Sequence, residues 1–159
     1  APFLAAPLII LLRPGTTGVL CLLSTQSCML PVDRETLFEL SIASVPSGKV
    51  ENQSVKVAMR SVFKLFWRPE GLPGDPLEAY QQLRWTRNSQ GVQLTNPTPY
   101  YINLIQVSVN GKALSNVGVV PPKSQRQTSW CQAIAPCHVA WRAINDYGGL
   151  SAKKEQNLP

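Results

Sequence analysis

Groups that enzymes use for catalysis are scarce in this chain of 159 residues, which holds one histidine and nine carboxylate side chains. A catalytic site needs positioned acids, bases or nucleophiles, and these carboxylates are scattered along the sequence. The histidine, His138, directly follows Cys137, and neighbouring side chains of an extended strand point to opposite faces. The two therefore do not form a thiolate and imidazole pair, and we expect no catalytic residues and no enzymatic activity.

Signatures of bound metals and nucleotides are also missing. The four cysteines, Cys21, Cys28, Cys131 and Cys137, lack the short Cys-x2-Cys spacing of most zinc sites, and only His138 could add a further ligand. No glycine-rich loop follows a strand and opens a helix, which is the arrangement that binds phosphate groups. We therefore expect no metal site and no cofactor.

The sequence has no long hydrophobic run and no cluster of basic residues. The apolar stretch from Phe3 to Leu12 is interrupted by Pro7 and is shorter than the ~20 residues that span a bilayer, so we expect no membrane insertion. Lysine and arginine exceed aspartate and glutamate by 15 to 9, which favours anionic partners. Without a Lys/Arg run, a basic β-domain that binds nucleic acid is only a minor alternative, and no nucleic acid is expected.

Short apolar runs separated by Pro, Gly and Asn turns make up most of the chain, and helical periodicity is limited to residues 76–85. This pattern predicts an all-β fold. The strands are expected at residues 8–12, 18–23, 37–43, 55–67, 83–87, 91–95, 101–109 and 137–143. The sharpest hairpin signal is Asn110-Gly111, because both residues readily adopt the positive φ angles of a two-residue turn.

The densest cluster of proline and glycine, residues 68–76, follows the longest expected strand and is the natural domain boundary. We therefore expect two small β-domains, residues 1–69 and 70–159. The second has enough strands for a sandwich. The first has only about four, whereas a Greek-key sandwich has about seven, so the first domain is expected to be incomplete.

The longest expected strand, Val55 to Trp67, carries mostly apolar residues on one parity, while its basic residues, including Lys64, all lie on the other, where they alternate with apolar ones. An edge strand with such alternation is an aggregation hazard unless a partner covers it. Taken alone, the residues also fit a half-buried strand whose apolar side chains face the core of its own domain and whose lysine is solvated. Strict alternation places Lys64 on the face opposite Val55, Val57 and Met59, so either the strand twists or bulges or Lys64 acts from the other face.

The pair Cys131 and Cys137 flanks the segment QAIAP, whose Pro136 suits a turn. The two residues could meet across neighbouring strands as a disulfide in an oxidising compartment, or remain two buried thiols.

Four motifs occur in the order found in the periplasmic chaperones of chaperone-usher pili: DRETLFEL (33–40), FKLFWRP (63–69), LTNPTPYYINL (94–104) and INDYGG (144–149). The first block, PFLAAPLIILLRPG, fits as well, and the chain resembles that family over nearly its whole length. The resemblance implies two immunoglobulin-like β-sandwich domains with a cleft between them. It also implies a periplasmic protein whose partners are pilus subunits and the outer-membrane usher.

The resemblance gives the long strand a role, because these chaperones lend the last strand of their first domain to a subunit whose own sandwich lacks one. It implies that Val55, Val57 and Met59 fill the subunit groove by donor-strand complementation. It also implies that Lys64 binds the C-terminal carboxylate of the subunit.

Glu35, Arg68 and Asp146 match the charged residues that form a network across the two domains of these chaperones. Exposed ion pairs contribute only about 0 to 1 kcal/mol, so the expected role of the network is orientation more than stability. In an exported protein, Cys131 and Cys137 are expected to form a disulfide.

The chain also departs from the family. It starts without a Met or a basic leader and lacks the early strands, one of which carries the arginine that partners the lysine at position 64. We therefore expect it to begin inside a larger design, with any export signal upstream. The alternative function is a truncated or degenerate relative without subunit-binding activity. Cys21 and Cys28 have no role in this scheme, and whether they pair is left open.

Overall fold

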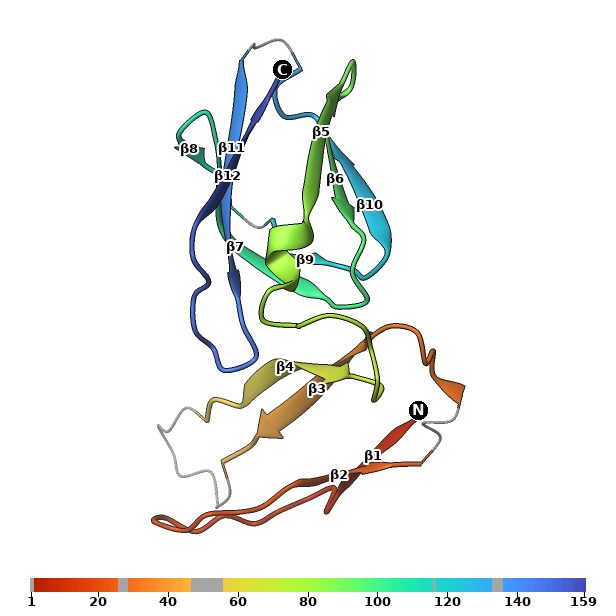
Figure 1. Ribbon diagram of the computed structural model, residues 1–159. Coiled ribbons are helices and arrows are strands. Elements are labelled where there is room, and N and C mark those ends of the chain that lie inside the picture. Colours follow the sequence, from red (N-terminus) through yellow and green to blue (C-terminus); the bar gives the residue numbers. More distant parts are fainter. Residues whose placement is uncertain (1, 26–28, 47–55, 116, 133–135) are drawn as a thin grey trace. The chain divides into compact units, whose positions relative to one another are not determined.

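The computed structural model describes residues 2–25, 29–46, 56–115, 117–132 and 136–159, which consist almost entirely of strands and turns (Figure 1). The expected all-β fold is confirmed. The chain divides into two compact units, Ala1–Val32 and Asp33–Pro159. Within the described ranges, no helix has the length and apolar character needed to cross a membrane.

The first unit contains one antiparallel pair, β1 (Phe3–Ala6) and β2 (Cys21–Ser24), with Phe3 opposite Ser24. The prediction of a strand at residues 8–12 is wrong, because these residues form no strand and Ile9 is 90% exposed to solvent. Pro7, which lacks an amide donor, directly follows β1 and stops the ladder there. Cys21 is exposed, and Cys28 lies outside the described residues.

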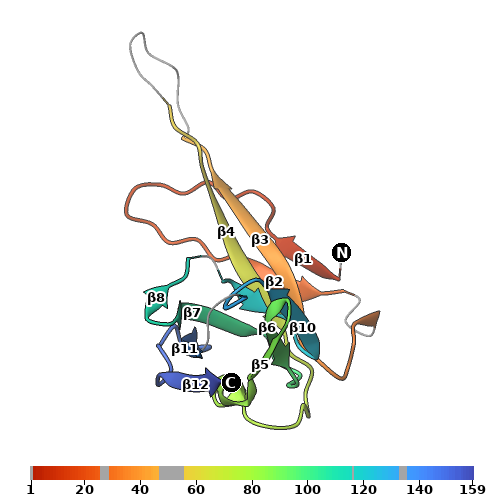
Figure 2. The same ribbon diagram turned by 90° about the horizontal axis from the view of Figure 1, so that it is seen from above.

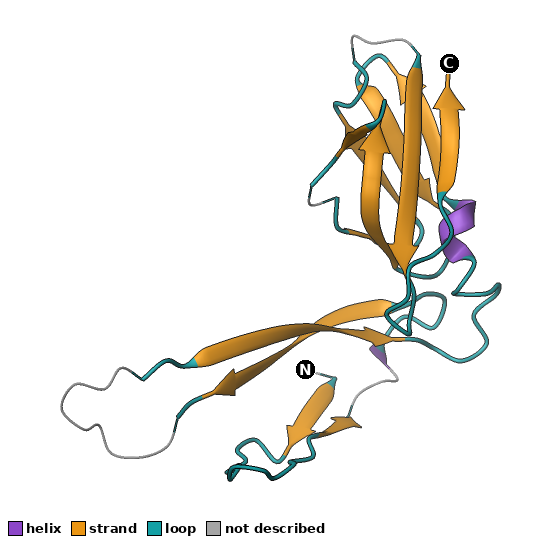
Figure 3. Cartoon of the chain, turned by 90° about the vertical axis from the view of Figure 1, so that its left-hand side faces the viewer, coloured by secondary structure: helices purple, strands orange, loops and turns teal. Residues whose placement is uncertain are grey.

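The second unit begins with a long antiparallel pair, β3 (Thr36–Ser44) and β4 (Met59–Trp67), each of nine residues. Figures 2 and 3 show the two strands side by side and twisted along their length. The observed strand β4 is shorter than the predicted one, which ran from Val55 to Trp67, because residues 56–58 are described without strand pairing. Val55 lies outside the described residues.

The remainder of the second unit is a β-sandwich. Its two sheets form two layers in Figure 1, and the short 3-10 helix η2 (Ala79–Gln82) precedes the first strand. One sheet has the order β10 (Ser124–Thr128), β6 (Gly91–Asn96), β5 (Arg84–Asn88). The other has the order β12 (Lys154–Leu158), β11 (Cys137–Ile144), β7 (Ile102–Val109), β8 (Lys112–Ala113), with β9 (Val119–Val120) also paired to β7.

The core of the sandwich lies between these sheets and contains Trp85, Leu94, Val107 and Val139, each at most 1% exposed. The ring of Trp85 lies 5.4 Å from that of Trp141, measured between centroids. Large aromatic and branched side chains from both sheets therefore exclude water from the interior and supply the main stabilising free energy of this domain.

The hairpin predicted at Asn110-Gly111 is confirmed. The two residues have φ angles of 49° and 78°, and they connect Val109 of β7 to Lys112 of β8, which lie opposite each other. Four strands, β1, β9, β10 and β12, were not predicted from the sequence.

Candidate functional site

The pair β3 and β4 has two chemically different faces. The register runs without a shift from Thr36 opposite Trp67 to Ser44 opposite Met59. Because strand side chains alternate, Met59 and Lys64 lie on opposite faces, and no bulge brings them together. The face of Met59 is otherwise largely apolar, with side chains from Phe38, Leu40, Ile42, Phe63, Leu65 and Trp67. The face of Lys64 carries most of the charged side chains of the two strands.

The first part of β4 is open to solvent. Met59 is 67% exposed and Phe63 is 52% exposed, and Val57, just before the strand, is 66% exposed. Among the described residues, β4 pairs only with β3, so the backbone N–H and C=O groups of its other edge have no strand partner there. Such an edge is a template for another extended chain.

The cations on the face of Lys64 differ in their contacts. Arg60 donates from Nε to Ser41 Oγ at 2.5 Å, and Arg68 binds two carboxylates. Lys64 is exposed, and its ammonium makes no hydrogen bond or ion pair with any residue that the structure describes. Of these three side chains only Arg68 is paired with carboxylates, so the charges of Lys64 and Arg60 are both available to an anion from outside, and Lys64 is the one whose donors are all unused among the described residues.

Arg68 joins two carboxylates that are far apart in the sequence. It donates from Nε to Glu35 Oε1 at 2.6 Å and, in bidentate fashion, to Asp146 at 2.6 and 3.1 Å. Its guanidinium also lies 5.3 Å from the centre of the Tyr100 ring. The hydrogen bonds to Asp146, reinforced by Glu35, raise the pKa of Arg68 further above its usual range. Bidentate pairs of this kind fix orientation as well as supplying energy.

Glu35 is the buried member of this network, with its side chain only 2% exposed. Its second carboxylate oxygen accepts the backbone N–H of Tyr101 at 2.6 Å, and its own N–H donates to Pro99 at 2.9 Å. Phe66 of β4 packs beside Tyr101, with 5.5 Å between ring centres. The structure thus brings together Glu35, Arg68 and Asp146, the three charged residues that the sequence singled out.

A second ion pair connects the start of the second unit to the sandwich, and no motif in the sequence indicated it. Asp33 accepts from Lys123 Nζ at 2.6 Å and from the side chain of Arg34 at 3.0 Å. The hydrogen bond from Arg34, followed by that from Lys123, lowers the pKa of Asp33 far below its usual value. Asp33 and Lys123 are 90 residues apart, so only the folded chain reveals the pair.

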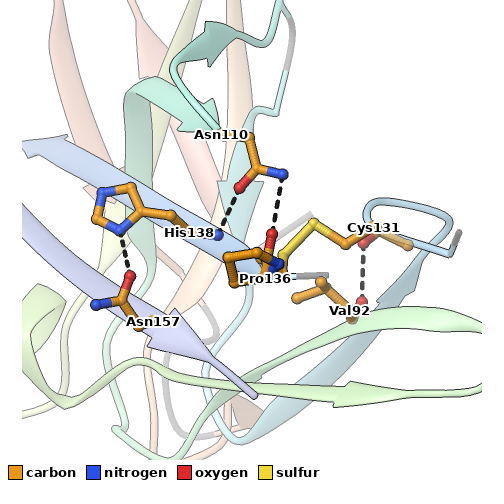
Figure 4. The surroundings of a disulfide bond; sticks show 8 residues. Val92, Asn110, Cys131, Pro136, His138 and Asn157 are labelled. Atoms are coloured by element: carbon orange, nitrogen blue, oxygen red, sulfur yellow. Dashed lines mark hydrogen bonds between the residues drawn. A yellow bond between two sulfur atoms is a disulfide. The ribbon is translucent and has the colours of Figure 1, made fainter. Parts of the chain in front are cut away.

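Cys131 and Cys137 form the expected disulfide, with their Cα atoms 5.9 Å apart (Figure 4). The sulfur of Cys137 is therefore bonded, and the Nδ1 atom of His138 lies 2.8 Å from Oδ1 of Asn157. In the part of the chain that the structure describes, no group of three or more His, Cys, Asp or Glu side chains could hold a metal ion.

Two family models match the chain. Residues 1–73 match the model "Pili and flagellar-assembly chaperone, PapD N-terminal domain", and residues 78–155 match "Pili assembly chaperone PapD, C-terminal domain". The gap between them includes part of the Pro/Gly cluster at residues 68–76. The exact boundary at residues 69 and 70 stays a prediction.

Curated relatives in Escherichia coli strain K12 include the fimbrial chaperone YcbF, the probable fimbrial chaperone protein ElfD and the chaperone protein FimC. The chain is 94% identical to YcbF over its full length, 37% identical to ElfD over 93% of it and 31% identical to FimC over 95% of it. It spans 67%, 64% and 63% of the length of these relatives, respectively.

Solved structures agree with these relatives. The chain is 30% identical to a chain in the complex of the Salmonella enterica SafA pilin with the SafB chaperone, with a TM-score of 0.85, covering 98% of this chain and 74% of that one. For the Escherichia coli chaperone DraB, the identity is 30% and the TM-score 0.84, with coverage of 98% and 75%. The expected fold class, two immunoglobulin-like domains, is confirmed.

Proposed function

This chain belongs to the family of pili assembly chaperones, and from that premise we propose that it caps pilus subunits in the periplasm by donor-strand complementation through β4. The observation that carries the proposal is the open edge of β4, with exposed apolar side chains at Val57 and Met59. A subunit strand added there gains main-chain hydrogen bonds, and its groove takes up the alternate side chains. Val55 belongs to the same series, although it lies outside the described residues.

The proposed anchor of the subunit is Lys64, which would bind the C-terminal carboxylate. Its exposed ammonium has no partner among the described residues, while Arg60 and Arg68 on the same face are engaged. A charge-assisted hydrogen bond to a carboxylate is roughly twice as strong as a neutral one. Because Met59 and Lys64 lie on opposite faces of β4, the subunit would contact the strand along its edge and reach Lys64 from the other face.

The network of Glu35, Arg68 and Asp146 would then hold β4 in a fixed orientation toward the sandwich. Arg68 directly follows β4, and its bidentate contact with Asp146 and its contact with buried Glu35 restrict where the strand can point. A donor strand held in one orientation loses less conformational freedom on binding. The outer-membrane usher is the second partner in this proposal, as the acceptor of the capped subunit.

Co-expression with each candidate pilus subunit of the same genome tests the proposal. We expect a soluble one-to-one complex that is lost in Lys64→Ala and in Met59→Asp. Lys112→Ala and Val32→Asp are the matched controls, since Lys112 and Val32 are also exposed but lie outside β4. A wild-type chain that retains no subunit would favour the alternative of a relative without subunit-binding activity.

A further inference from the structure

Glu39 of β3 lies directly opposite Lys64 in the register of the β3 and β4 pair. Residues that lie opposite each other in an antiparallel pair project from the same face, with their Cβ atoms about 4.5 to 5.5 Å apart. The carboxylate of Glu39 is therefore the nearest negative charge that the strand pair offers to the Lys64 ammonium. The sequence did not single out Glu39, because 25 residues separate it from Lys64.

Neither charge of this pair is bound by a neighbouring side chain among the described residues. On the same face, Glu35 is bound by Arg68 and Ser41 accepts from Arg60. Glu39 and Lys64 are both exposed, and neither side chain forms a salt bridge with any residue in the described ranges. The two charges are thus within electrostatic reach of each other, but Lys64 is not held by a closed ion pair.

We propose that Glu39 is a specificity-determining residue that competes with an incoming carboxylate for Lys64; this inference rests on the proposed role of Lys64 as the anchor. A ligand carboxylate that approaches Lys64 must also approach the Glu39 carboxylate, so like-charge repulsion opposes part of the attraction. In the free protein, the Glu39 carboxylate already lies across the strand pair from Lys64, so an incoming carboxylate has to compete with it. Glu39 therefore weakens the preference of the Lys64 site for a peptide with a free C-terminal carboxylate over a peptide with a neutral C-terminus.

The preference can be measured with two forms of one probe, a short fluorescein-labelled peptide of alternating valine and threonine, ending in a free carboxylate or in an amide. The ratio of their dissociation constants for the full chain, measured by fluorescence polarisation, reports the anchor alone, because the strand contacts are common to both. Glu39→Gln should raise the preference for the carboxylate about two- to fivefold, the range expected for one cross-strand charge pair.

Glu70→Gln is the matched control, since it removes the same charge from an exposed position outside the strand pair. Lys64→Gln should abolish the preference, and if it does not, the anchor in the proposed function fails and the role of Glu39 fails with it. If Lys64→Gln abolishes the preference but Glu39→Gln behaves like Glu70→Gln, or lowers the preference, only the role of Glu39 is overturned. A wild-type chain that binds neither peptide contradicts both proposals.

Discussion

Strands β11 and β4 are similar in length, at eight and nine residues, and both are rich in apolar residues, yet their environments differ. In β11 every residue except Ile144 is buried or half-buried, and the strand is paired on both edges, by β12 and β7. In β4 the residues from Met59 to Lys64 are exposed, and within the described residues only one edge is paired. The neighbours of a strand, and not its own composition, therefore decide whether it contributes to a core or presents a surface.

The sharpest way to test this contrast is to introduce the same charge into both strands. Val139 of β11 is fully buried, and Val139→Asp would place a carboxylate in the sandwich core without a partner, destabilising the domain by at least about 4 kcal/mol. Val62 of β4 is 54% exposed, and Val62→Asp should change the free energy of unfolding by less than about 0.5 kcal/mol. Urea denaturation followed by circular dichroism measures both. Equal losses would mean that β4 is as buried as β11 in solution.

A smaller effect is expected where β4 meets the sandwich. Arg68→Gln would leave the buried carboxylate of Glu35 without its cation, and we expect a loss of about 2 kcal/mol, reduced by the partial exposure of Arg68. Arg60→Gln is the control on the same face, because Arg60 is exposed and contacts one hydroxyl, and it should cost less than about 0.5 kcal/mol. If the two variants lose the same free energy in urea denaturation, the network around Glu35 contributes no more than an ordinary surface contact.

Local patterns in the sequence predicted the regular parts of the fold. The alternating residues of β6, β7 and β11 gave strands within one residue of the observed bounds, and Asn110-Gly111 gave its hairpin, because both signals depend on a few neighbouring residues. The strand β10, with the sequence SQRQT, was missed because no residue in it is apolar. It forms a strand because β6 supplies a backbone partner along its whole length.

The candidate site could be predicted only where motifs carried the information. The motifs singled out Glu35, Arg68 and Asp146, which the fold brings together. They did not single out Glu39 or the pair of Asp33 with Lys123, because each depends on register or on contacts between distant segments. The length of β4 was overestimated because alternation continues through residues 55–58, whereas the described residues 56–58 have no strand pairing.

The smallest expected effect concerns the pair of Asp33 with Lys123, which ties the segment before β3 to the sandwich. Lys123→Gln removes one of the two side chains whose hydrogen bonds lower the pKa of Asp33, so that pKa should rise toward its ordinary value of 3.8. The rise should be incomplete, because hydrogen bonding from Arg34 is the larger cause and remains. Carboxyl carbon chemical shifts, followed by NMR between neutral and acidic pH, measure this change. Lys112→Gln, at an exposed position of the β7 and β8 hairpin, is the control.

The sign of the pH dependence follows from the direction of that shift. Because the pKa of Asp33 is lower in the folded chain than in the unfolded one, the unfolded chain binds a proton first as the pH falls. The stabilisation from Asp33 is therefore complete above the ordinary pKa of 3.8 and is lost as the pH falls below it, toward the folded pKa. The free energy of unfolding of Lys123→Gln should accordingly differ from that of the wild type at neutral pH, and the difference should shrink in acid. A difference that stays constant with pH would show that Lys123 stabilises the chain by contacts other than the one with the Asp33 carboxylate.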